Sequence, residues 1–191
     1  MEDSVDRHVA RWRNWDEISF DDEVEAAATR IGMIAKHLKR SSRKAAAEVG
    51  LQWFEYETLH ALMIREIPGR TTPTELATRL MLSPAGISKR LDSMETAGLL
   101  RRIPSAADRR RVDVVISEQG REQWRRTMRL RGQTEEAMLG VLTQDQQHAL
   151  NQLLRQLLAP LEQLQPSDPS PDPGPSPSPG PDPVQAGRRC P

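Results

Sequence analysis

The side chains best suited to chemistry in this sequence are three consecutive arginines at positions 109–111, which directly follow Asp108. A guanidinium group binds phosphate oxygens through paired N–H donors and stays charged at physiological pH. Three such charges repel one another unless an acid or a polyanion neutralises them. The segment therefore predicts a phosphate-binding surface, in which Asp108 either orients one arginine or relieves the repulsion among them.

The composition excludes several classes of protein. The 191 residues hold 27 basic and 27 acidic side chains, so the net charge indicates no partner, yet bases outnumber acids between positions 84 and 111. No apolar run approaches the roughly 18 residues that span a membrane, and the charged N-terminus lacks a secretion signal. We expect a cytoplasmic protein without membrane contact. The single cysteine, Cys190, excludes an internal disulfide.

Two short helices in close succession precede the arginine cluster. The pairs Thr72–Pro73 and Ser83–Pro84 each join an N-cap residue to a proline suited to the first helical turn, and Gly98 is a typical helix end. Small and polar residues occupy one face of the second helix. Its other face is apolar and is formed by Ile87, Leu91 and Met94. Two short helices joined by so tight a turn predict a helix-turn-helix.

The apolar pattern then changes to that of strands. Residues 99–103 and 111–117 predict two short strands, and residues 104–110 connect them as a hairpin. The arginine cluster then lies at the tip of a basic hairpin that follows the helix-turn-helix.

Longer helices surround these elements. Helical spacing of apolar residues predicts helices over 21–42, 52–64 and 118–142, and a capping box at Thr143 begins a last helix. Leucines between 150 and 164 form a stripe that is wide for a surface helix, which predicts burial against a second chain.

The chain divides into three parts by composition. The last part alternates proline with Ser, Asp and Gly, and such a segment buries too little apolar surface to fold, so we expect disorder. The three parts are an N-terminal extension with an extra helix (1–20), one folded domain (21–164) and the Pro/Ser/Asp-rich tail (165–191).

The order of these elements resembles the MarR (multiple-antibiotic-resistance regulator) family. The resemblance rests on TPTELATRLMLSPAGISKRLDSMETAGLLRR and DRRRVDVVISEQG, and it covers about residues 22–164. It implies a mainly α fold with a small β-hairpin wing, that is, a winged helix-turn-helix with terminal dimerisation helices. It further implies a homodimer that binds a palindromic operator in double-stranded DNA and represses transcription until a small effector releases it.

Two groups of residues are expected to contact DNA. The exposed side of the second short helix would enter the major groove, where Lys89 and Arg90 reach phosphates or guanine. By the resemblance, Arg110 enters the minor groove of A·T-rich DNA and Asp108 orients it, while the neighbouring arginines contact phosphates. The full sets are Ser83, Ala85, Gly86, Ser88, Lys89, Arg90 and Ser93 in the helix, and Arg101, Arg102, Asp108, Arg109, Arg110 and Arg111 in the wing.

A tryptophan on the N-terminal extension resembles the urate-responsive, PecS-like branch of that family. This resemblance implies a pocket for a small anionic effector, formed by Trp12, Glu57 and Arg90. That branch has Asp in place of Glu57 and Asn in place of Lys89, so the pocket would be altered here. Alternatively, Trp12 and Trp15 only fasten the extra helix to the dimer.

An enzyme is the competing class. The sequence has no glycine-rich phosphate loop, no metal-spaced His/Cys cluster and no nucleophile motif, so we expect no enzymatic activity, no cofactor and no metal site. Two other interpretations stay open: a winged helix that binds only a protein partner, and a redox-responsive regulator that acts through Cys190. A steep salt dependence of binding would distinguish DNA from a protein partner.

Overall fold

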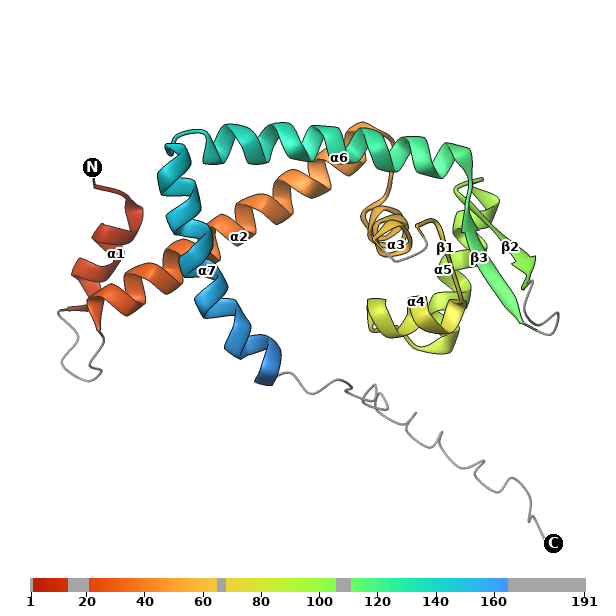
Figure 1. The fold of residues 1–191 in the computed structure, drawn as a ribbon, viewed down its shortest axis with the longest axis horizontal. Helices are drawn as coiled ribbons and strands as arrows, with labels where there is room; N and C mark the ends of the chain where they lie inside the picture. The colour runs from red at the N-terminus through yellow and green to blue at the C-terminus, as the bar shows by residue number, and fades with distance from the viewer. Residues whose placement is uncertain (1, 14–20, 65–67, 106–110, 165–191) are drawn as a thin grey trace, which may run out of the picture.

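A small lobe of helices and a sheet lies at one end of the molecule, and long helices extend from it to the other end (Figure 1). The computed structural model describes residues 2–13, 21–64, 68–105 and 111–164. The helices are α1 (Ser4–Trp12), α2 (Asp22–Glu48), α3 (Trp53–Met63), α4 (Pro73–Leu80), α5 (Pro84–Thr96), α6 (Glu118–Leu139) and α7 (Gln144–Leu164). The strands are β1 (Arg70–Thr71), β2 (Leu100–Pro104) and β3 (Val112–Ile116).

The predicted caps begin the two short helices of the small lobe. Ser83 Oγ accepts a hydrogen bond from the N–H of Gly86 at 3.1 Å, and Thr72 Oγ1 accepts one from the N–H of Glu75 at 3.2 Å. Helices α4 and α5 therefore begin at the prolines that follow these caps. The turn between the helices passes through Met81, whose φ of 52° is left-handed. The helix-turn-helix predicted from the sequence is confirmed.

The longer helices begin where the sequence predicts, and α2 ends later. Asp21 caps α2, Ser117 caps α6, and Thr143 exchanges two hydrogen bonds with the third residue of α7. Helix α2 passes the predicted end near residue 42 and continues to Glu48. Its last turns are rich in alanine, which favours a helix and here also packs into the core.

The sheet has three antiparallel strands in the order β1-β3-β2. The predicted hairpin is confirmed as β2 and β3, and its connecting residues 106–110 lie outside the described residues. Strand β1 was not predicted, because only two residues form it. Arg70 pairs with Val115, and Thr71 pairs with Val114, so β1 closes the free edge of β3.

One hydrophobic core lies between the helices of the small lobe and the sheet. The predicted inner face of α5 is confirmed, since Ile87, Leu91 and Met94 are at most 3% exposed. Side chains of α3, α4 and the strands complete this core, chiefly Leu59, Leu62, Leu76, Leu100 and Val114. The core therefore holds α5 by one face and leaves the other face outward.

Helix α6 crosses the base of the hairpin at Gly120. Ser117 Oγ accepts a hydrogen bond from the N–H of Gly120 at 2.9 Å and donates one to the carbonyl of Gly98 at 2.6 Å. A Cβ atom on Gly120 would lie 2.1 Å from the carbonyl oxygen of Leu99, a distance that no side chain tolerates. Glycine thus permits the close approach that joins α6 to the small lobe.

The N-terminal extension contains a helix, as predicted, and α1 packs on the first half of α2. Val5 and Val9 are buried there. Arg30 donates hydrogen bonds to Asp3 at 2.9 Å and to Asp6 at 2.6 Å. The Arg30 guanidinium holds the pKa of Asp3 at about 2, so this carboxylate is charged at neutral pH.

Helix α7 buries none of its residues against the described part of the chain. Its leucine stripe is 41–59% exposed and comprises Leu153, Leu154, Leu157, Leu158 and Leu161. Helix α2 adds further exposed apolar side chains, namely Val24, Ile31, Met33 and Ile34. Both helices therefore carry large apolar side chains that stay exposed in the described part of the chain.

Candidate functional site

Helix α5 presents small and polar side chains on the face opposite the core. Most of the residues predicted to contact DNA from this helix are exposed: Ser83, Ala85, Ser88, Lys89 and Ser93. Gly86 is half-buried, and its N–H donates a hydrogen bond to the capping Ser83. The small side chains let the start of α5 approach a surface closely, and Lys89 adds positive charge there.

Arg90 points away from this outer face and lies against α3. Its side chain is 18% exposed, and Nη1 lies 3.4 Å from Oγ1 of Thr58 and 3.8 Å from Oε2 of Glu57. Its guanidinium also lies 5.6 Å from the centre of the Phe54 ring. The structure thus brings together Arg90 and Glu57, two of the residues predicted for the effector pocket, and links α5 to α3 through them.

The two arginines of β2 differ in environment. Arg101 is exposed, whereas Arg102 is half-buried and paired with Asp92 and Glu95 of α5. Arg111 is exposed just before β3. The remaining predicted wing residues, Asp108, Arg109 and Arg110, lie outside the described residues, so their roles stay predictions.

An ion pair between the partly exposed Arg70 and the buried Asp113 fixes the third strand to the hairpin. Asp113 is only 7% exposed, although a carboxylate is rarely buried without a partner. Arg70 of β1 donates to Oδ2 of Asp113 from Nε at 2.8 Å and from Nη2 at 2.5 Å. The unpredicted strand explains this burial, because it brings a guanidinium to the carboxylate and satisfies its charge.

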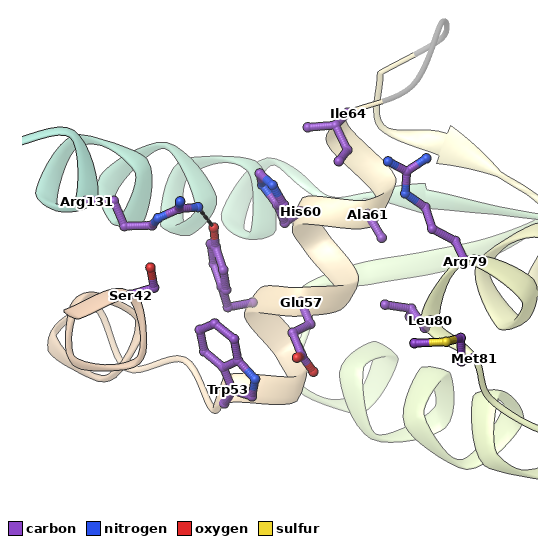
Figure 2. Close-up of a pocket in the computed structure, with 11 residues that line it drawn as sticks. Ser42, Trp53, Glu57, His60, Ala61, Ile64, Arg79, Leu80, Met81 and Arg131 are labelled. Atoms are coloured by element: carbon purple, nitrogen blue, oxygen red, sulfur yellow. Dashed lines mark hydrogen bonds between the residues drawn. The ribbon is translucent and has the colours of Figure 1, made fainter. Parts of the chain in front are cut away.

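A cavity of about 400 Å³ opens between α3, α4 and α6, near the end of α2 (Figure 2). Glu57 lies in its wall, so the residue that contacts Arg90 also faces the cavity. Two arginines lie at its border, Arg79 from α4 and Arg131 from α6. The other lining residues are Ser42, Trp53, Tyr56, His60, Ala61, Ile64, Leu80 and Met81.

A row of rings runs from α3 to α6, and its members Trp53, Tyr56 and His60 line this cavity. The ring centres of Trp53 and Tyr56 lie 5.3 Å apart, those of Tyr56 and His60 5.5 Å, and those of His60 and Trp124 6.4 Å. Arg131 donates a hydrogen bond to the Tyr56 hydroxyl (Figure 2). Burial raises the pKa of Tyr56 and lowers that of His60, so both rings favour their neutral forms.

This row was missed in the sequence. Trp53, Tyr56 and His60 follow one another at intervals of three and four residues, which places them on one side of a helix. That spacing was the available signal. Trp124 and Arg131 join them only because α6 packs against α3, and no local pattern predicts that contact.

Trp12, the third residue predicted for the effector pocket, lies elsewhere in this chain. Its indole N–H donates to Nε2 of His8 at 2.7 Å, and Nε2 of His8 lies 3.5 Å from Oε1 of Glu25. Helix α1 packs on the first half of α2, at the other end of the molecule from α3 and α5 (Figure 1). A single chain therefore does not bring Trp12 to Glu57 and Arg90.

The described part of the chain offers no candidate for a metal site or for a membrane-spanning helix. No group of three or more His, Cys, Asp or Glu side chains there is arranged to hold a metal ion. None of the described helices is both long enough and apolar enough to cross a membrane. Trp15 and Cys190 lie outside the described residues, so the roles predicted for them stay untested.

The chain is similar to known regulators in sequence and in fold. Residues 50–111 match the model of the MarR family. The transcriptional regulator PecS of Dickeya dadantii (strain 3937) is 26% identical over 146 residues, which cover 76% of this chain and 87% of that protein.

Solved structures share the fold at lower identity. A MarR-family protein from Bacillus stearothermophilus is 18% identical with a TM-score of 0.65, over 75% of this chain and 99% of that one. A mutant of MepR from S. aureus, bound to an oligodeoxyribonucleotide, is 18% identical with a TM-score of 0.54, over the same shares of the two chains. The predicted winged helix-turn-helix fold is confirmed.

Proposed function

We propose that the chain is a transcriptional regulator of the MarR family, and that it represses transcription as a homodimer, which binds a palindromic operator and leaves it when a small anionic effector binds. The observation that carries this proposal is the exposed face of α5 beside a hairpin with exposed basic residues. A helix of small and polar residues fits the major groove, and basic hairpin residues supply phosphate contacts. The cytoplasm is the proposed location.

The exposed leucines of α7 support the homodimer. A helix of 21 residues that fully buries none of them against the described part of its chain needs another apolar surface. A second copy supplies one by two-fold symmetry, so the same residues would be buried on both sides. Two symmetric copies of α5 would then read two half-sites about one helical turn of DNA apart.

The contact between Glu57 and Arg90 supports a response to an effector. Glu57 lies in the wall of the cavity and Arg90 belongs to α5, so a ligand that contacts Glu57 changes the partner of a recognition-helix residue. The rings of Trp53, Tyr56 and His60 would favour a flat ligand, and Arg79 and Arg131 at the border would favour a negative charge on it. If α5 can adopt two orientations, a ligand that binds one of them more tightly shifts the population toward that orientation.

Selection from a random-sequence duplex pool tests the DNA-binding proposal. We expect the wild-type protein to enrich an inverted repeat and to bind it with two chains per duplex. Recovery of no sequence preference, or binding of one chain per half-site without cooperation, would contradict it.

A titration of the protein–DNA complex with urate or a tricarboxylate tests the effector proposal. We expect release of the DNA by such an anion and a weaker response in Glu57→Gln. Trp12→Ala is informative as well, because a reduced response would show that Trp12 reaches the cavity in the dimer. Wild-type release together with no change in Glu57→Gln would assign the effector site elsewhere.

The wing residues outside the described part of the chain remain part of this proposal. Arg110→Ala should weaken binding to A·T-rich operators most, since a narrow minor groove concentrates negative potential. Arg109→Ala and Arg111→Ala should mainly reduce the salt dependence, by about one unit of slope per lost phosphate contact. Equal effects of all three changes would indicate only a diffuse basic patch.

A further inference from the structure

Arg102 lies in the middle of β2, and its side chain turns toward α5. Successive residues of a strand point to opposite faces, so Arg102 shares a face with the buried Leu100 and Arg101 takes the other one. The Arg102 side chain is accordingly 26% exposed, whereas Arg101 is exposed. These adjacent arginines therefore have different surroundings and need not share a role.

The Arg102 side chain bridges two successive turns of α5. Its Nη1 lies 2.5 Å from Oδ1 of Asp92 and 3.6 Å from Oε2 of Glu95, and its Nη2 donates to the carbonyl of Ser88 at 3.1 Å. The backbone N–H of Arg102 also donates to Oε1 of Glu95 at 2.7 Å. At the base of the hairpin, Ser117 bonds to Gly98. The contacts of Arg102 add a second attachment between the hairpin and α5, further along β2.

The charges around Arg102 oppose a direct contact with phosphate. Two carboxylates and one carbonyl already surround the guanidinium. A phosphate that approached it would meet Asp92, whose side chain is 63% exposed. A guanidinium that left for DNA would also leave the two carboxylates without this partner.

We propose that Arg102 is a positioning residue, which fixes the angle between the hairpin and α5 so that both reach their grooves in one binding event. The proposal rests on the DNA binding proposed above. A hairpin free to move relative to α5 would have to be ordered on binding, and that ordering reduces affinity. Arg102 acts here through Asp92 and Glu95 rather than through DNA.

Asp92→Asn distinguishes a positioning role of Arg102 from a direct phosphate contact, because the two roles predict opposite changes in duplex affinity. Removal of a negative charge near DNA strengthens binding if Arg102 is free to contact phosphate. If Asp92 holds Arg102 in position, the same change weakens binding, by about 5-fold in Kd for a coupling typical of such contacts. Fluorescence anisotropy measures this Kd with a duplex that the wild-type protein selects from a random-sequence pool.

A double-mutant cycle separates a shared role from two independent ones. Arg102→Gln should weaken binding, and the Asp92→Asn/Arg102→Gln double variant should be no weaker than Arg102→Gln alone, because the two residues act as a unit. Arg101→Gln is the matched control on the same strand, and its effect should add to that of Asp92→Asn. Circular dichroism melting shows that each variant is folded.

The outcomes are distinguishable from a failure of the proposed function. Absence of duplex binding by the wild-type protein contradicts the DNA-binding proposal itself. Wild-type binding combined with tighter binding of Asp92→Asn, or with additive effects of Asp92→Asn and Arg102→Gln, overturns the positioning role of Arg102.

Discussion

Leu157→Ala should weaken the proposed dimer, and the structure gives the size of the effect. Leu157 lies in the middle of the α7 stripe and is 56% exposed in the single chain. Complete burial of a leucine is worth about 1.5–3 kcal/mol, so the exposed half contributes about 1 kcal/mol. Both chains of a two-fold dimer carry the substitution, so the dimer loses about 2 kcal/mol of association free energy. This loss corresponds to a roughly 30-fold higher dimer Kd.

Sedimentation equilibrium over a range of protein concentrations measures this Kd directly. Leu161→Ala, 55% exposed on the same stripe, should behave alike. Gln156→Ala is the matched control, since it lies on α7 outside the leucine stripe and should leave the Kd unchanged. A dimer Kd that neither leucine change alters would refute the assignment of this surface to the dimer, and so would a wild-type chain that stays monomeric.

The remaining predictions concern stability, measured as the free energy of unfolding in urea. Gly120→Ala should lose about 2 kcal/mol or more, because its Cβ would overlap the Leu99 carbonyl; Gly132→Ala in the same helix meets nothing within 4 Å and should gain about 0.5–1 kcal/mol. Equal losses at both positions would contradict this packing. Met81→Gly should gain about 1 kcal/mol, because the residue is left-handed and 83% exposed; a loss would contradict it. Burial lowers the pKa of His60, so the unfolded chain takes up its proton first as the pH falls below 6.5. Stability should therefore decline from that pH down to the lowered pKa, and His60→Gln should reduce the decline; an unchanged acid profile would contradict this.

Local signals predicted the small lobe well, because each signal is satisfied within a few residues. The caps at Thr72 and Ser83 each accept a hydrogen bond from the N–H three positions further along, and Gly98 adopts the positive φ that ends α5. The hairpin strands also follow from their own alternation. Such features need no knowledge of distant contacts.

Features that depend on distant contacts were not predictable in the same way. Asp113 is buried because Arg70 reaches it from a two-residue strand, which is too short to show a pattern. Arg90 was expected to contact both DNA and the effector. In this structure it lies against Glu57, because α3 packs beside α5. Arg102 was grouped with the DNA-contacting arginines by sequence position alone, although strand alternation already separates it from Arg101.

The salt dependence of duplex binding tests the central claim most directly. The exposed bases Lys89, Arg101 and Arg111 occur once in each chain, so a homodimer brings six to the DNA. Six phosphate contacts predict a slope of about −5 in a plot of log K against log salt concentration, and the wing tips would make it steeper. A linear dependence at least this steep is the expected result. A flat dependence, or no duplex binding at low salt, would contradict DNA recognition and favour a winged helix that binds a protein.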